Sequence, residues 1–530
     1  MSERSPVNAR PDAAAEAAAF LAFLQADHDE APHDDDGDSL DVDPAEALTF
    51  EPVKHGRPLT DLGNAERFAD RNIGRALYCY PWGYWLVWDG RRWIQDDSGA
   101  TEALAKLTVR QTYVEAAGTR VETERKALGK WALASETRYR IKAMLELAQS
   151  ELAVTPKVLD ANPLQLNVLN GTLDLTTGNL RPHHPGDLLT KLAPVSYDPD
   201  ARYPLWDRFL AETTDDDPDL IRFLARCVGY SLTGNTSEEK LFFVHGPAAA
   251  GKSSFLEAVK AILGDYSTTA DFETFLARSY VGGPRPDIAR LAGIRMVASV
   301  EVAEGRRLAE GLVKLLTGGD TVTARFLYHG EFEFLPQFKL WLSANAAPVA
   351  KHDDLALWRR ILKLPFDHTI PEDKRDPSVK ARLKDPEMAG PAILAWAVQG
   401  CMDWQAIGLA IPERVEQATE SYRLSQDPLR EFIEECCVLD LDAWMSATEL
   451  RGAYEAWGRE NGISEKALVQ GKRWGEGMRA RGCEQVRQYV GERQVRGWKG
   501  IGLVPNESPQ NTSASELPGF CGYRRDKQDR

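Results

Sequence analysis

The chain contains 530 residues, of which 43% are hydrophobic and 27% are charged. At roughly 100–200 residues per domain, this length predicts three or four domains with apolar cores, and it excludes a peptide, a fibrous protein and a wholly disordered chain. The formal net charge of −16 argues at first against a nucleic-acid partner, because phosphate binding requires a positive surface. The charge is unevenly distributed, however. Residues 1–60 carry 14 acidic and four basic side chains, whereas residues 466–500 carry nine basic and three acidic ones.

The seven cysteines are scattered and include no Cys-x-x-Cys pair, so we expect reduced thiols without disulfides or zinc. No apolar run approaches the roughly 18–20 residues that span a bilayer, and the N-terminus is acidic where a signal peptide would be basic. These features predict a cytoplasmic protein that has no membrane partner.

Residues 1–60 predict a disordered acidic tail because they combine high charge with few aromatic residues. Alternatively, residues 13–25 form a short helix that docks on a partner. Residues 62–200 predict a small α/β module. It begins with aromatic strands that meet at a hairpin turn, Asp89-Gly90, continues with helices over residues 101–155, and ends with strands over residues 164–182. The tryptophans near the hairpin predict an aromatic core, or else a stacking platform for single-stranded bases.

Residues 205–232 predict helices, and from about residue 240 apolar strands alternate with Gly-rich loops and helices, which indicates an α/β fold. The strand Leu241–His245 leads directly into Gly246-Pro-Ala-Ala-Ala-Gly251-Lys252-Ser253, and a helix follows. A Gly-x-x-x-x-Gly-Lys-Ser sequence between a strand and a helix is the phosphate-binding loop of nucleoside triphosphatases. Backbone N–H groups and Lys252 would neutralise the phosphates of ATP, and the Ser253 hydroxyl would bind Mg²⁺.

Three downstream features accompany this loop. An apolar strand over residues 294–300 ends at Glu301, whose carboxylate would order the attacking water and the Mg²⁺ shell. A second strand ends near Asn345, an uncharged polar side chain able to contact the γ-phosphate. Paired arginines, Arg359 and Arg360, precede a third strand, and one of them would act as an arginine finger in a neighbouring subunit's ATP site. The alternatives without a catalytic role are that Glu301 is a solvated acid, that Asn345 belongs to an Asn-rich turn, and that the two arginines form a surface ion-pair site.

Together with residues 314–325, these motifs resemble the superfamily 3 helicase core, and more closely the phage/plasmid primase-helicase family related to the poxvirus helicase-primase. The resemblance covers about residues 62–504 and implies an α/β, AAA+-like P-loop ATPase core over residues 201–370, with a helical lid or linker over residues 371–427. It implies the catalytic residues Lys252, Glu301, Asn345, Arg359 and Arg360, with Mg²⁺ held by Ser253 and Glu301. The residues implied to bind ATP are Gly246, Pro247, Ala248, Ala249, Ala250, Gly251, Lys252, Ser253 and Ser254. In one departure from the family, Val300 and Val302 flank Glu301, where many members have two adjacent acids.

Two regions are candidates for contacting DNA. The sequence predicts a β-hairpin between Arg325 and Phe338, and in superfamily 3 helicases such a hairpin tracks DNA in a central channel; His329, Lys314 and Arg325 resemble that arrangement. Residues 428–504 predict a winged-helix domain, followed by a tail over residues 505–530. The alternatives are a purely structural hairpin and a solvated basic face. The basic residues expected to bind DNA in the second region are Lys472, Arg473, Arg479, Arg487, Arg493, Arg496 and Lys499.

These features predict an ATP-dependent DNA helicase of phage or plasmid replication that forms a ring, expected to be a hexamer, in a bacterial host cell. No primase activity is expected, because only an acidic stretch containing Asp41-Val-Asp43 precedes the module; the partners would be DNA, copies of the chain and a separate primase or other replication proteins. The alternative is an ATP-switched initiator that binds origin DNA without unwinding it. A DNA-packaging motor is disfavoured, since no nuclease domain is evident.

Overall fold

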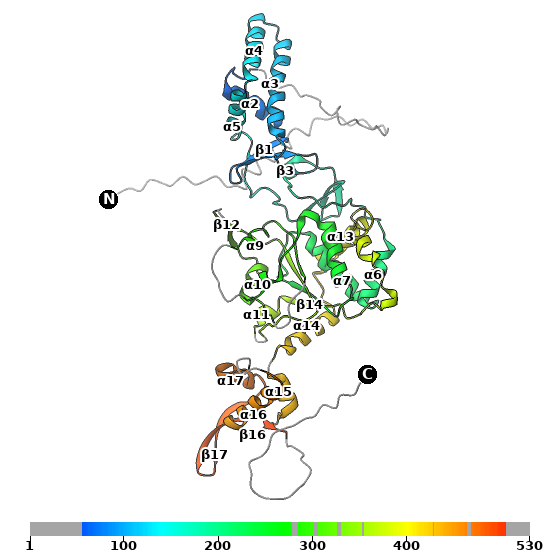
Figure 1. Cartoon of the computed structure of the whole chain (residues 1–530), viewed down its shortest axis with the longest axis vertical. Coiled ribbons are helices and arrows are strands. Elements are labelled where there is room, and N and C mark those ends of the chain that lie inside the picture. The colour runs from blue at the N-terminus through cyan, green and yellow to red at the C-terminus, as the bar shows by residue number, and fades with distance from the viewer. Residues whose placement is uncertain are drawn as a thin grey trace, which may run out of the picture.

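The computed structural model describes residues 56–277, 285–300, 306–325, 330–351, 354–427, 429–463 and 468–504. The segment 13–25, nearly all of the acidic tail and the whole of the C-terminal tail therefore lie outside the described residues. Figure 1 shows three successive units along the long axis: an N-terminal unit, a central unit around a β-sheet, and a C-terminal unit that follows helix α14.

The N-terminal unit packs helices against a four-stranded sheet in the order β3-β2-β1-β4, with β1 and β4 parallel. The expected hairpin at Asp89-Gly90 is present between β2 and β3. The tryptophans differ in burial: only 2% of the surface of Trp93 is exposed, whereas Trp82 is 40% exposed. The elements are α2 (Asp61–Asn72), β1 (Ala76–Cys79), β2 (Tyr84–Trp88), β3 (Trp93–Gln95), α3 (Ala100–Gly118), α4 (Glu122–Ser135), α5 (Arg138–Ala148) and β4 (Ala153–Val154).

A small antiparallel sheet follows, as the turn residues over 164–182 predicted. Its strands are β5 (Gln165–Val168), β6 (Gly171–Asp174) and β7 (Asn179–Arg181), before the short helix η1 (Pro185–Asp187). Gly171 has a positive φ, and a Cβ there would meet the carbonyl oxygen of Arg181 at 2.3 Å, so this position requires glycine. The expected helices come next as α6 (Pro204–Thr214) and α7 (Pro218–Leu232). Asp217 caps α7, because its side chain accepts from the backbone N–H groups of Asp219 and Leu220.

The central unit is built on a five-stranded sheet in the order β14-β8-β13-β10-β9, in which every pairing is parallel. Because parallel strands need crossover connections, helices cover both faces and the central strands are almost wholly apolar. The strands are β8 (Leu241–His245), β9 (Ser267–Thr269), β10 (Met296–Val300), β13 (Lys339–Ala344) and β14 (Ile361–Pro365). A separate two-stranded sheet pairs β11 (Val322–Arg325) with β12 (Glu331–Phe334).

Helices around this sheet include the segment expected to be a lid or linker. Its longest helix, α13, packs closely on α7, since a Cβ at Gly229 or Gly400 would meet the opposing backbone at about 2 Å. This segment therefore contributes to the core that also contains β8. The helices are α8 (Lys252–Leu263), η2 (Gly264–Tyr266), η3 (Phe272–Phe275), α9 (Pro286–Ala289), α10 (Glu310–Thr317), α11 (Leu355–Trp358), η4 (Glu372–Lys374), α12 (Ser378–Lys384), α13 (Gly390–Ile407) and α14 (Glu413–Ser425).

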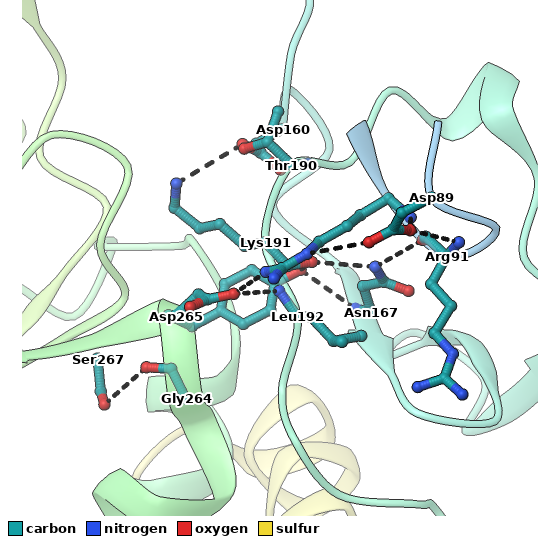
Figure 2. A network of polar contacts seen from close by, with 12 residues as sticks. Asp89, Arg91, Asp160, Asn167, Thr190, Lys191, Leu192, Gly264, Asp265 and Ser267 are labelled. Atoms are coloured by element: carbon teal, nitrogen blue, oxygen red, sulfur yellow. Dashed lines mark hydrogen bonds and ion pairs between the residues drawn. The ribbon is translucent and has the colours of Figure 1, made fainter. Parts of the chain in front are cut away.

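A polar network joins the N-terminal unit to the C-terminal end of α8 (Figure 2). Asn167, which is fully buried, donates through Nδ2 to the carbonyl oxygens of Arg91 at 2.9 Å and Lys191 at 3.0 Å. Asp265, directly after α8, forms an ion pair with Arg92 of the β2–β3 turn. The network fixes the turn of one unit against the end of the helix that carries Lys252 in the other.

In its described residues, the C-terminal unit has three helices, a three-stranded antiparallel sheet in the order β16-β18-β17, and a short β15–β19 pair. Ser446 caps α16: its Oγ accepts from the N–H of Glu449 and donates to the Glu449 carboxylate. The elements are α15 (Arg430–Cys436), β15 (Cys437–Val438), β16 (Trp444–Ser446), α16 (Ala447–Glu460), α17 (Gly471–Ala480), β17 (Glu484–Val490), β18 (Arg493–Lys499) and β19 (Gly502–Leu503). Among the described residues no helix is long and apolar enough to cross a bilayer.

Candidate functional site

The predicted phosphate-binding loop joins the C-terminal end of β8 to the first turn of α8. Glycine is required at both ends of the loop, because a Cβ at Gly246 would lie 1.9 Å from the carbonyl oxygen of Phe366, and one at Gly251 would lie 2.3 Å from Thr213 Cγ2. Gly251 and Ala249 both have positive φ angles. Alternating backbone conformations of this kind turn successive N–H groups toward one side, which makes a concave anion site.

The loop has the donors that an anion needs. For the N–H groups of Ala248, Ala249 and Gly251, the described residues provide no hydrogen-bond acceptor. Lys252 is 7% exposed, and its Nζ donates to the carbonyl oxygens of Gly246 at 2.7 Å and Pro247 at 2.5 Å. Burial lowers the pKa of Lys252 from its ordinary value. The lysine thus lies in the mouth of the loop beside unpaired donors, at the positive end of a helix dipole.

The strand register brings the predicted sensor to the same edge of the sheet. Ala344 lies beside His245, so Asn345, which is exposed, follows β13 at the level of Gly246. Strand β10 is parallel to β13 and ends at Val300, beside Ser343. Glu301 lies outside the described residues, but the predicted strand before it is confirmed. Since the carboxyl ends of parallel strands meet at one edge, the loop, Asn345 and the end of β10 share that edge.

The arginine pair lies at the opposite edge of the sheet. Arg360 immediately precedes β14, and its carbonyl oxygen accepts from the N–H of Leu241, the first residue of β8, at 2.7 Å. The loop follows the other end of the five-residue strand β8. At about 3.3 Å per residue, the two ends of that strand are roughly 15 Å apart. The arginines therefore do not reach the phosphate loop of their own chain.

The two arginines have different surroundings. The side chain of Arg360 is 8% exposed and binds Glu239 at 2.9 Å and the carbonyl oxygen of Ala356 at 2.7 Å. That of Arg359 is 63% exposed and contacts the same oxygen of that glutamate, Oε2, at 3.2 Å. Glu239 was not expected from the sequence, and no local pattern indicates it, because it lies 120 residues from Arg359. The side chain of Arg360 is therefore buried and held by contacts within its own chain, whereas that of Arg359 is largely exposed to solvent.

His245 is a second residue that the motifs do not reveal, although it directly precedes the loop. Its ring is half-buried, and Nδ1 is a buried atom without a hydrogen-bond partner among the described residues. Burial, together with the nearby charges of Lys363 and Lys252, lowers the pKa of His245 to about 4. The imidazole is therefore neutral at physiological pH.

The residues expected at the hairpin are only partly brought together. Arg325 ends β11 opposite Glu331 on β12, so an antiparallel pair is present, but its first strand precedes Arg325 instead of following it as the sequence predicted. His329 lies outside the described residues. Lys314 is on α10, where Nζ binds Asp354 Oδ2 at 2.7 Å. Its charge is therefore compensated by a carboxylate, and a role for these three residues in DNA binding stays a prediction.

The basic residues of the C-terminal unit are on its surface. Lys472, Arg473 and Arg479 are exposed on α17, where Lys472 contacts Glu476 at 3.5 Å. The hairpin of β17 and β18 carries four more exposed basic residues, listed here in chain order: Arg487, Arg493, Arg496 and Lys499. The helix α17 and the hairpin are consecutive in the chain, so the predicted basic region is continuous.

A divalent cation is implied by the phosphate loop. The described residues contain no cluster of three or more His, Cys, Asp or Glu side chains that could hold a metal by themselves. Mg²⁺ in nucleotide sites takes most of its ligands from phosphates and water, with one or two from the protein. Ser253, at the start of α8 and half-buried beside the loop, fits that limited role.

The fold and site define an α/β protein with a parallel five-stranded sheet of the P-loop type. Residues 65–215 match the family described as "D5 N terminal like". The chain is 29% identical over 297 residues to "Putative helicase L207/L206" of Acanthamoeba polyphaga mimivirus, which covers 52% of this chain and 30% of that protein. It is 25% identical over 428 residues to "Putative helicase 022R" of Frog virus 3 (isolate Goorha), and this match covers 65% of this chain and 43% of that protein.

These matches confirm a distant homology to viral proteins named as helicases, as the motifs indicated. The chain spans less than half the length of either relative. Among solved structures, the C-terminal region of NrS-1 aligns with 81% of this chain and 96% of its own length, with a TM-score of 0.43 and 10% identity.

Proposed function

We propose that this chain is an ATP-dependent DNA helicase of phage or plasmid replication that works as a ring, expected to be a hexamer, in the bacterial cytoplasm. One observation carries the proposal: the phosphate loop and Asn345 lie at one edge of the sheet, and Arg359 lies at the other. Such a site is incomplete within one chain and becomes complete when a neighbouring copy supplies its arginine. The strand order β14-β8-β13-β10-β9 supports a P-loop core in this proposal, since the phosphate loop follows an inner strand, β8, of a wholly parallel sheet.

In this proposal the loop N–H groups and Lys252 bind the phosphates of ATP. Lys252 exchanges the carbonyl oxygens of Gly246 and Pro247 for phosphate oxygens, which charge-assisted hydrogen bonding favours. Ser253 and Glu301 would hold Mg²⁺, which neutralises phosphate charge when bound. Asn345 contacts the γ-phosphate. The arginine of the neighbouring copy stabilises the negative charge that develops when the γ-phosphate is transferred to water.

We propose that the C-terminal unit is a winged-helix module that binds DNA. Its order of a helix, two short strands, two helices and a β-hairpin supports this, as does the basic surface of α17 and the hairpin. ATP hydrolysis in the ring would then move the β11–β12 hairpins along one strand of the DNA while the C-terminal module holds the DNA.

A strand-displacement assay on a forked duplex tests the function directly. A helicase releases the labelled strand with ATP and Mg²⁺, does not release it without ATP, and hydrolyses ATP continuously when DNA is present. Tight ATP binding with slow turnover and no displacement would instead favour the ATP-switched initiator. The Lys252→Ala variant is the control that removes the phosphate contact.

A further inference from the structure

The hairpin of β17 and β18 has two faces that differ in charge. Directly opposed residues of an antiparallel pair lie on the same face, and faces alternate along each strand. The register therefore puts Arg487 opposite Arg496 on one face, together with Tyr489 opposite Gln494. The other face holds Lys499 opposite Glu484, and Arg493 opposite Val490. We call the first the Arg487/Arg496 face.

The Arg487/Arg496 face carries uncompensated positive charge. Like charges that are directly opposed across two strands destabilise a hairpin. The other residues of this face are neutral, and Arg496 is bonded to the amide oxygen of Gln485 rather than to a carboxylate. On the opposite face, by contrast, Lys499 has Glu484 as its cross-strand neighbour. A pair of arginines held together without an acid is expected where a polyanion supplies the missing charge.

The same face continues the surface of α17. At the base of the hairpin, Trp498 lies on this face and is buried against the helix, where an added Cβ at Gly475 would be 3.8 Å from the indole. On the opposite face, the ring of Trp444 covers Gly497. The exposed basic residues of α17 and the Arg487/Arg496 face therefore border one surface. The hairpin extends away from the rest of the unit (Figure 1).

An aromatic side chain lies near the tip of this face. Tyr489 is 72% exposed, two residues along the strand from Arg487, and has no ring partner among the described residues. A large exposed ring beside a pair of arginines offers an apolar contact to a sugar or a base edge, which lysines and arginines alone do not.

We propose that the surface formed by α17 and the Arg487/Arg496 face binds duplex DNA, with the helix in one groove and Tyr489 against the neighbouring minor groove. Arg493 and Lys499, on the other face, do not take part. This inference rests on the proposed DNA-dependent function, and it narrows the seven basic residues expected from the sequence. A helix together with a projecting hairpin suits a duplex, because its two grooves accept one element each.

Fluorescence anisotropy with a short labelled duplex and the full chain, without nucleotide, tests the proposal. The double variant Arg487→Ala/Arg496→Ala should bind about tenfold or more weakly, and the slope of log affinity against log salt should fall in magnitude by about 2, because two phosphate contacts are lost. The matched control, Arg493→Ala/Lys499→Ala, removes the same charge from the opposite face and should lose less than about threefold. Tyr489→Ala should weaken binding without changing the salt slope, and Tyr489→Phe should restore it.

Equal losses in both double variants would overturn the proposal, since general charge and not one face would then govern binding. Undiminished binding by Arg487→Ala/Arg496→Ala would overturn it as well. So would a loss confined to a single-stranded probe of the same sequence, because the partner would then not be a duplex. Strand displacement by the wild type is measured separately. If the wild type unwinds DNA but the Arg487→Ala/Arg496→Ala variant binds the duplex normally, only this inference is refuted. If that variant loses binding but the wild type does not unwind DNA, only the helicase function is refuted.

Discussion

The N–H of Leu241 donates to the carbonyl oxygen of Arg360 at 2.7 Å, and this bond fixes the arginine pair at the edge of the sheet opposite the phosphate loop. Because both strands run in the same direction, the start of β14 cannot approach the end of β8. In the proposed ring, an arginine finger at this position would therefore serve the ATP of another copy.

The exposure of the two arginines predicts that their substitutions differ. Arg359→Ala should reduce ATP turnover by about a thousandfold, as loss of an arginine finger does, with the free energy of unfolding changed by less than about 1 kcal/mol. Arg360→Ala should lower the free energy of unfolding by about 1–3 kcal/mol, because its buried contacts with Glu239 and Ala356 are lost. Turnover and urea denaturation measure the two effects. The reverse pattern would make Arg360 the finger.

Mixing inactive variants tests whether the site is shared. Lys252→Ala and Arg359→Ala subunits should each be inactive alone, yet a random equal mixture should regain activity at roughly one interface in four, where each copy supplies its intact residue. Mixed rings without any recovery of turnover would contradict a shared site. A mixture of Lys252→Ala with the double variant Lys252→Ala/Arg359→Ala is the matched control, because it contains no intact interface.

Local sequence signals predicted much of this structure because local physics determined it. The phosphate loop was recognisable since its glycines, lysine and serine act within one strand–loop–helix unit. The turn at Asp89-Gly90 is likewise decided by neighbouring residues, and it is present between β2 and β3. The alternating β17–β18 residues also contained the signal for two different faces, although the sequence alone did not assign them.

What the sequence could not provide were relationships between distant segments. Arg92 and Asp265 are 173 residues apart, and no periodicity relates them. The choice between Arg359 and Arg360 depends on Glu239, which is positioned by a strand pairing rather than by proximity in the chain. Trp82 and Trp93 belong to one aromatic run, but only the fold decides which of them is buried.

The neutral His245 predicts a pH dependence of stability. Its folded-state pKa of about 4 lies below the ordinary value of 6.5, so the unfolded chain binds more protons between these values. The free energy of unfolding should therefore fall as the pH drops from 6.5 to 4, by on the order of 1 kcal/mol once solvent screening of the half-exposed ring is allowed for. His245→Asn should flatten this part of the profile, as measured by urea denaturation at several pH values. An unchanged slope in the variant would assign the dependence to other groups.

The junction between the N-terminal and central units predicts a ranking of two substitutions. Arg92→Ala removes an ion pair whose partner, Asp265, has a half-exposed side chain, so the free energy of unfolding should change by less than about 1 kcal/mol. Asn167→Ala leaves the carbonyl oxygen of Arg91 without its donor and leaves that of Lys191 with only the Tyr266 hydroxyl at 3.4 Å, so it should lower the free energy of unfolding by about 1–3 kcal/mol. Urea denaturation followed by tryptophan fluorescence measures both, with Arg91→Ala as the control because only the backbone oxygen of Arg91 is used. If Arg92→Ala were the more damaging change, the exposed ion pair and not the buried amide would hold the two units together.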